Sequence, residues 1–125
     1  MKSPIKLSYP DKRLSPNARM NRFALAKIKQ DAREEGFFAA KQAGLKIKNQ
    51  WLQIFIRIHP PDKRKRDDDN VVASLKAARD GIFDALGIDD NQVRVASHGF
   101  GRVVQGGMIF IWIEPLESVP EWLEV

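Results

Sequence analysis

The stretch WLQIFIRIHPPDKRKRDDDN, residues 51–70, carries the strongest structural signals in this chain. Four aliphatic residues alternate with polar or aromatic ones: Leu52, Ile54, Ile56 and Ile58. This alternation predicts a half-buried strand over residues 51–58. Two prolines and a basic run then predict a loop over residues 59–66, and three consecutive aspartates and Asn70 follow. A strand, a basic loop and an acidic helix start are therefore expected in direct succession.

Upstream of this stretch, residues 5–9 can form a short strand, and residues 10–17 form a loop marked by Pro, Ser and Asn. A helix rich in Ala, Lys and Arg is expected over residues 18–43. Gly36 is expected to weaken or bend that helix, and Gly44 to end it.

Downstream, an apolar stripe of helical period predicts a second helix over residues 71–86, closed by Gly87. Asp69 or Asn70 is the expected N-cap. Residues 93–97 and 108–113 are expected to pair as a hairpin across a glycine-rich connection.

The resulting order, β-α-β-α-β-β, predicts one α+β domain over residues 1–125, with a mixed sheet and two main helices. An acidic tail is expected over about residues 115–125.

Charge is divided unevenly along the chain. Residues 1–66 hold 17 of the 21 Lys and Arg but 5 of the 16 acids, whereas residues 67–125 hold 4 bases and 11 acids. A basic half suggests a polyanionic partner such as nucleic acid, although solvated helix faces would look similar. The absence of cysteine excludes disulfides and cysteine-bound zinc. With no apolar run of about 18 residues and no secretory signal, a cytoplasmic location is expected.

The run Asp67-Asp68-Asp69 is the clearest candidate for chemistry. In extended backbone Asp67 and Asp69 point to one side and Asp68 to the other. Two converging carboxylates beside a helix N-terminus suit magnesium, which takes one or two carboxylates and keeps water and phosphate as other ligands. The alternative is a helix start rich in capping acids, which the helix dipole favours.

A second acidic cluster, Asp89-Asp90-Asn91, follows the second helix. It is consistent with an ordinary turn. If the chain instead returned antiparallel to the strand at residues 51–58, Asp90 would approach Asp67 and Asp69, and three carboxylates would converge on a metal.

Basic residues stand next to the first cluster. Lys63, Arg64, Lys65 and Arg66 are candidates for phosphate contacts, or for a solvated loop. Lys76 could aim at a scissile phosphate or pair with Asp80 one helical turn on.

Histidines and aromatic residues give weaker signals. His59 and His98 are expected to be satisfied strand-end residues, because two histidines are too few for a zinc site. Trp51, Phe55 and Trp112 could stack on bases, but on predicted strands they favour core packing or a subunit interface.

Several stretches of the chain form a recognisable set: HPPDKRKRDDDN at residues 59–70, KAA at 76–78, FDAL at 83–86 and DDNQV at 89–93, with LSYP at 7–10 and SPN at 15–17 as looser matches. Together they resemble the RusA family of Holliday-junction resolvases. The specific match covers about residues 59–95.

The resemblance implies a homodimeric endonuclease that resolves four-way DNA junctions by paired symmetric nicks, in DNA recombination and repair. It implies Mg²⁺, with Mn²⁺ as a substitute, a metal-activated water as the attacking group, and Asp67, Asp69 and Asp90 as catalytic metal ligands. Asp68 and Asp89 are not implied as ligands, and Asn70 matches the motif as a helix cap.

One position departs from the family pattern. The family lysine falls three residues after the motif Asn, where this chain has Ala73, so Lys76 is the expected substitute. It would lie about 4.5 Å further along the same helix face. The alternatives to a junction resolvase are a catalytically inactive structure-specific DNA-binding protein and a nuclease of broader specificity for branched nucleic acids.

Overall fold

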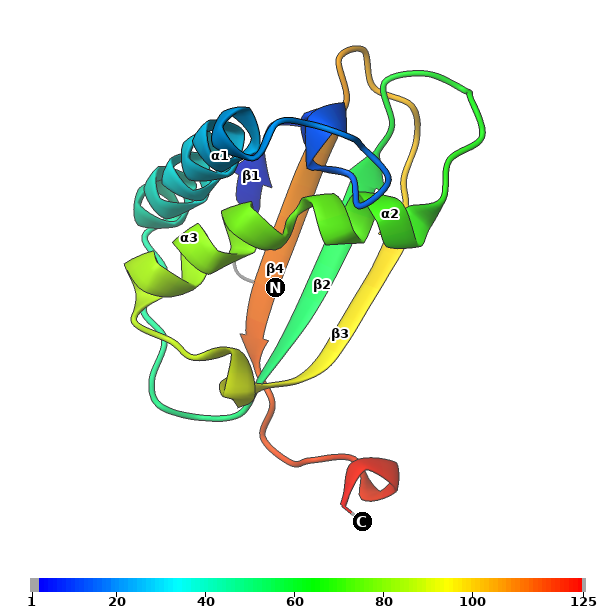
Figure 1. Cartoon of the computed structure of the whole chain (residues 1–125). Helices are drawn as coiled ribbons and strands as arrows, with labels where there is room; N and C mark the ends of the chain where they lie inside the picture. The colour runs from blue at the N-terminus through cyan, green and yellow to red at the C-terminus, as the bar shows by residue number, and fades with distance from the viewer. Residues whose placement is uncertain (1–2, 125) are drawn as a thin grey trace.

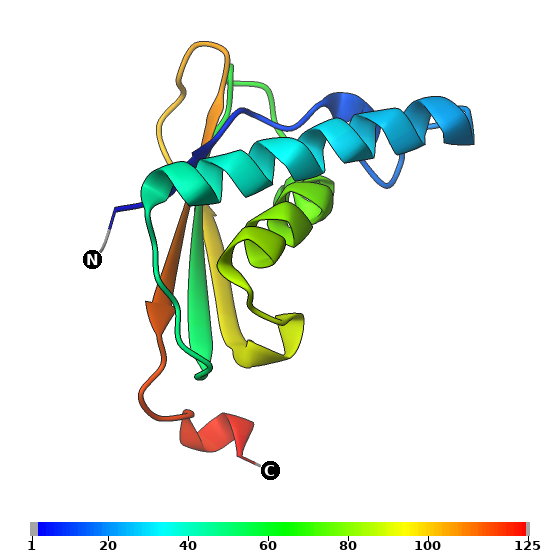
Figure 2. The same ribbon diagram turned by 90° about the vertical axis from the view of Figure 1, so that its left-hand side faces the viewer.

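The computed structural model describes residues 3–124 and contains one mixed four-stranded sheet covered by helices on one face (Figures 1 and 2). Its strands are β1 (Ile5–Leu7), β2 (Leu52–His59), β3 (Val93–Phe100) and β4 (Met108–Pro115). Its helices are α1 (Arg22–Ala43), α2 (Asp68–Ser74) and α3 (Lys76–Leu86), with short 3-10 turns η1 (Lys12–Leu14), η2 (Asp90–Gln92) and η3 (Glu121–Leu123). The predicted α+β class and mixed sheet are confirmed. None of the helices within residues 3–124 has the length and apolar character needed to cross a membrane.

The predicted hairpin of the last two strands is wrong. The spatial order is β1-β4-β2-β3, so β2 lies between β4 and β3, antiparallel to the first and parallel to the second. The seven-residue connection from Gly101 to Gly107 steps over the end of β2. Strand β4 pairs with β2 because the apolar faces of the two strands match. Every second residue of β2 and of β4 is aliphatic and buried, and the register sets them opposite each other, as in Ile56 with Ile111.

The alternation in β2 defines the two faces of the sheet. Leu52, Ile54, Ile56 and Ile58 are all at most 4% exposed and point at the helices, as do the buried isoleucines of β4. Leu75, Ala78 and Ile82 from the helices complete the same core. The strand residues between these positions lie on the opposite face of the sheet.

The second helix differs from the prediction at its start and in its middle. It begins at Asp68, because the Asp67 carboxylate accepts a hydrogen bond from the Asp69 backbone N–H at 2.9 Å, so Asp67 is the N-cap. The predicted caps, Asp69 and Asn70, are both inside the helix. At Leu75, with φ −89° and ψ −1°, the helix is interrupted and divides into α2 and α3.

Helices α1 and α3 meet at two glycines. A Cβ added to Gly36 would overlap the Ala78 carbonyl, and one added to Gly81 would overlap the Arg33 carbonyl. Gly36, which was expected to weaken or bend α1, thus allows close helix contact instead. Asp84 accepts from Arg33 across the same interface at 2.6 Å. The crossing holds α3 against α1 on the helical face of the sheet.

Candidate metal centre

The loop between β2 and α2 is organised by Asp62. Its carboxylate accepts hydrogen bonds from the Arg64 backbone and from the Arg64 and Arg66 side chains, which holds the Asp62 pKa well below its usual value. The Arg66 side chain is only 19% exposed and also lies over the Tyr9 ring. Four residues of this loop were predicted to bind DNA. Lys63, Arg64 and Lys65 are exposed, whereas Arg66 is partly buried and holds the loop in place.

The first turn of α2 places the three aspartates in different directions. Asp67 caps the helix and lines a shallow pocket of about 220 Å³ together with Asn70, Lys12 and Arg66. Asp68 and Asp69 occupy the first helical turn, where the helix dipole favours negative charge. The extended geometry that would have paired Asp67 with Asp69 is absent, since the helix begins at Asp68.

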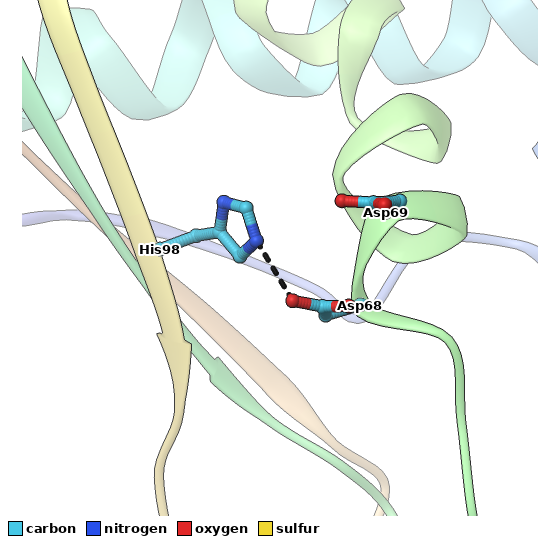
Figure 3. A group of neighbouring side chains, drawn as sticks. All are labelled: Asp68, Asp69 and His98. Atoms are coloured by element: carbon cyan, nitrogen blue, oxygen red, sulfur yellow. Dashed lines mark hydrogen bonds and ion pairs between the residues drawn. The ribbon is translucent and has the colours of Figure 1, made fainter.

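A histidine from β3 completes a group with two of these carboxylates. His98 is opposite Ile56 in the β2–β3 register, and its side chain therefore points to the helical face of the sheet. Its Nε2 lies 2.9 Å from Asp68 Oδ2, and one ligand atom from each of Asp68, Asp69 and His98 lies within 4.8 Å of the others (Figure 3). The hydrogen bond with His98 lowers the pKa of Asp68 below its usual value, because it favours the carboxylate form.

The donor atoms of this group suit a divalent cation. Two carboxylate oxygens and one imidazole nitrogen form a mixed donor set, in which the carboxylates suit Mg²⁺ and Mn²⁺ and the imidazole suits transition metals. The residues are half-buried or exposed, so a bound cation would keep open positions for water and phosphate. We call Asp68, Asp69 and His98 the Asp–Asp–His cluster.

The structure does not bring Asp90 to the Asp–Asp–His cluster within the chain. Strand β3 runs parallel to β2, not antiparallel, and Asp90 precedes its first residue, Val93. Val93 and His98 are five residues apart, a rise of about 16 Å along the strand. Figure 1 shows η2 and the start of α2 at opposite ends of β3.

Asp89 and Asp90 have different surroundings. Asp89 forms a capping box with Gln92: its carboxylate accepts from the Asn91 backbone at 3.0 Å, and its own backbone N–H donates to the Gln92 side chain at 2.9 Å. Asp90 lines an open pocket of about 360 Å³ together with Lys76, Arg79 and Asp80. The predicted turn is confirmed for this cluster.

Lys76 is the first residue of α3, and its Nζ lies 3.4 Å from Asp80. The side chain is 72% exposed. It therefore forms the i,i+4 pair that its spacing allowed, a weak contact that a phosphate can displace. Eight residues separate it from Asp68, about 12 Å along the helical segment.

Both histidines are hydrogen-bonded strand residues, as the sequence predicted, but His98 also lies beside two carboxylates. His59 is buried, and its Nδ1 lies 2.8 Å from the Arg102 carbonyl oxygen. His98 was not predicted as a candidate metal ligand, because its position opposite α2 depends on which strand pairs with β3. A local signal was the spacing of two residues between Ala96 and His98, which puts both side chains on the same face of a strand.

No family model matches the chain. It is similar to an uncharacterized protein of Xylella fastidiosa strain Temecula1, with 40% identity over 99 residues. The alignment covers 75% of this chain and 63% of that protein, so the chain spans less than two thirds of its relative's length.

Proposed function

We propose that this protein is a divalent-cation-dependent DNA endonuclease that resolves four-way junctions by paired symmetric nicks. The observation that carries the proposal is the position of the Asp–Asp–His cluster at the end of the exposed basic loop. Cation ligands and phosphate-binding side chains adjoin there, which is the combination that phosphodiester hydrolysis requires. The likeness of residues 59–95 to RusA-type resolvases supports the choice of junction DNA.

The cation would be Mg²⁺ or Mn²⁺. Bound to the cluster, it would lower the pKa of a coordinated water and offset charge on the phosphate. Within the set implied by the resemblance, Asp67, Asp69 and Asp90, Asp69 is the residue that belongs to the cluster. Asp67 would support the position of Asp69, because it caps the helix that contains Asp69.

The remaining residues of the chain would position DNA. Lys63, Arg64 and Lys65 extend into solvent from the loop before α2 and would hold the phosphates that flank the cut. Lys76, about 12 Å along the helical segment, would contact a phosphate further along the same strand and stabilise its charge. Asp90 shares its pocket with Lys76 and would orient that lysine.

A homodimer fits this activity. A four-way junction has near two-fold symmetry, and a C2 dimer would set one cluster on each of two opposing strands. Paired nicks of equal polarity would follow from that symmetry.

The test is cleavage of a labelled four-way junction by wild-type protein and by Asp69→Asn, with EDTA, Mg²⁺ or Mn²⁺. Paired, cation-dependent nicks that disappear in Asp69→Asn are expected. A duplex, a flap and an RNA junction serve as parallel substrates. Equal cutting of all branched substrates would indicate a broader nuclease, and tight junction binding with no cutting in either metal would indicate a junction-binding protein without nuclease activity.

A further inference from the structure

The sheet face turned away from the helices carries a group of aromatic and arginine side chains. Figures 1 and 2 show α1, α2 and α3 on the other face. Six residues define the group, which we call the open face: Trp51, Phe55, Arg57, Arg94, Phe110 and Trp112. Phe55 pairs with Trp112 and Arg57 with Phe110 in the β2–β4 register, out of phase with the buried isoleucines. Their side chains therefore share this face without belonging to the core.

Guanidinium groups lie over the rings of the open face. The Arg57 Cζ lies 4.9 Å from the Phe110 ring centroid and 5.0 Å from that of Trp112. The Arg94 Cζ lies 4.7 Å from the ring centroid of Trp51, and Trp51 is 45% exposed. Planar cations above aromatic rings give flat surfaces that stack with nucleobases and also bind phosphate.

The charge of the open face argues against a second copy of the chain as its occupant. Lys6, paired with Phe110 in the β1–β4 register, adds a third cation beside Arg57 and Arg94, and Glu114 contributes one carboxylate. A two-fold interface would set this surface against itself, bringing six cations together with two carboxylates. A polyanion with stackable bases matches both the charge and the rings.

We propose that the open face binds an unpaired DNA strand by base stacking, with Arg57, Arg94 and Lys6 holding its phosphates. The site is distinct from the Asp–Asp–His cluster, which is on the helical face, and binding there needs no metal. The choice of DNA over RNA rests on the proposed function.

The direct test measures fluorescence anisotropy of a labelled oligo-dT strand with wild type, Trp51→Ala and Trp112→Ala, in EDTA so that no cleavage occurs. Each change should weaken binding by roughly 5- to 150-fold. Phe38→Ala, which removes a 66% exposed ring from α1, is the matched control and should change affinity less than about twofold. Trp51 is exposed, so its replacement keeps the fold, and melting curves check Trp112→Ala.

Unchanged affinity in Trp51→Ala and Trp112→Ala would overturn the proposal, as would tighter binding of oligo-U or of a duplex of equal length. Because these measurements contain no metal, their outcome is independent of whether the protein cuts junctions. Light scattering, which measures the oligomeric state, tests the alternative that the open face is a subunit interface. A wild-type dimer that becomes a monomer in Trp112→Ala, with DNA affinity retained, would make the open face a subunit interface and reject the proposal.

Tryptophan emission gives a second measurement. The sequence has three tryptophans, so Trp122→Phe leaves only those of the open face, Trp51 and Trp112. Saturating oligo-dT should quench the emission of this variant, because stacked bases quench indole. Unchanged emission at saturation would contradict stacking and overturn the proposal.

Discussion

The two ends of the α2–α3 segment carry similar acidic clusters in different settings. At the start of α2, Asp68 and Asp69 face a histidine from β3, and their ligand atoms lie within 4.8 Å of it. After α3, Asp89 closes a capping box and Asp90 lines an open pocket beside Lys76. The residue types are the same, so neither composition nor spacing distinguishes the two. The difference is a partner side chain supplied by tertiary structure.

Within the first cluster, one aspartate has a structural role and two are available to a cation. Asp67 caps α2, as Asp89 caps η2. Because Asp67 has taken the capping position, Asp68 and Asp69 are not needed for it. Asp67 and Asp89 are therefore capping aspartates, whereas Asp68 and Asp69 are candidate cation ligands, and substitutions can test each role.

The largest effect is expected for Asp69→Asn. Removing one charged ligand while keeping its shape should slow junction cleavage at least about 100-fold, since the cation is no longer held. The rate of cleavage under single-turnover conditions measures this. Asp89→Asn is the matched control and should cut at nearly the wild-type rate. Equal loss in both variants would remove the distinction between the clusters.

A somewhat smaller effect is expected for His98→Ala. Loss of the imidazole should reduce Mn²⁺ affinity roughly 10- to 100-fold, which calorimetric titration measures. The neighbouring Ser97 points to the opposite face of the sheet, so Ser97→Ala should bind Mn²⁺ as the wild type does. If His98→Ala retained full affinity, the histidine would serve only to orient Asp68.

The capping roles of Asp67 and Asp89 should be detectable as losses in the free energy of unfolding. Asp67→Ala should lower the free energy of unfolding by about 1 kcal/mol, and Asp89→Ala by a similar or smaller amount, because each leaves a backbone N–H without its cap. Asp67→Asn should change stability little, since Asn also caps helices. Urea unfolding provides these values. A loss of several kcal/mol for Asp67→Ala would indicate a role beyond capping.

The smallest effect is expected for the pH dependence of the Asp68–His98 contact. The pKa of Asp68 is lowered in the folded protein, so the contact stabilises the fold above the unfolded pKa of about 3.8. That stability is lost as the pH falls through the folded pKa. The melting temperature of His98→Gln should therefore lie below that of the wild type near neutral pH and approach it in acid. A gap that is constant at all pH values would exclude the Asp68 carboxylate as its source.

The sequence predicted the elements better than their arrangement. Alternation in β2 and helical periodicity after Asn70 gave the α+β class, because each is a local property of burial. Strand order depends on which apolar faces match, and this placed β2 between β3 and β4. Because strand pairing could not be predicted, the candidate site was also predicted only in part. The basic loop and the aspartates are visible in residues 63–69, whereas His98 joins them only through the parallel β2–β3 pairing.

The central prediction is that Asp68, Asp69 and His98 bind one cation. Electron paramagnetic resonance of free Mn²⁺ during titration with protein tests this directly and does not depend on activity. We predict one Mn²⁺ bound per wild-type chain, strongly weakened binding in Asp69→Asn, and wild-type binding in Asp90→Asn. Mn²⁺ binding that survives in Asp69→Asn but is lost in Asp90→Asn would contradict this prediction and would assign the cation site to Asp90, at the other end of β3.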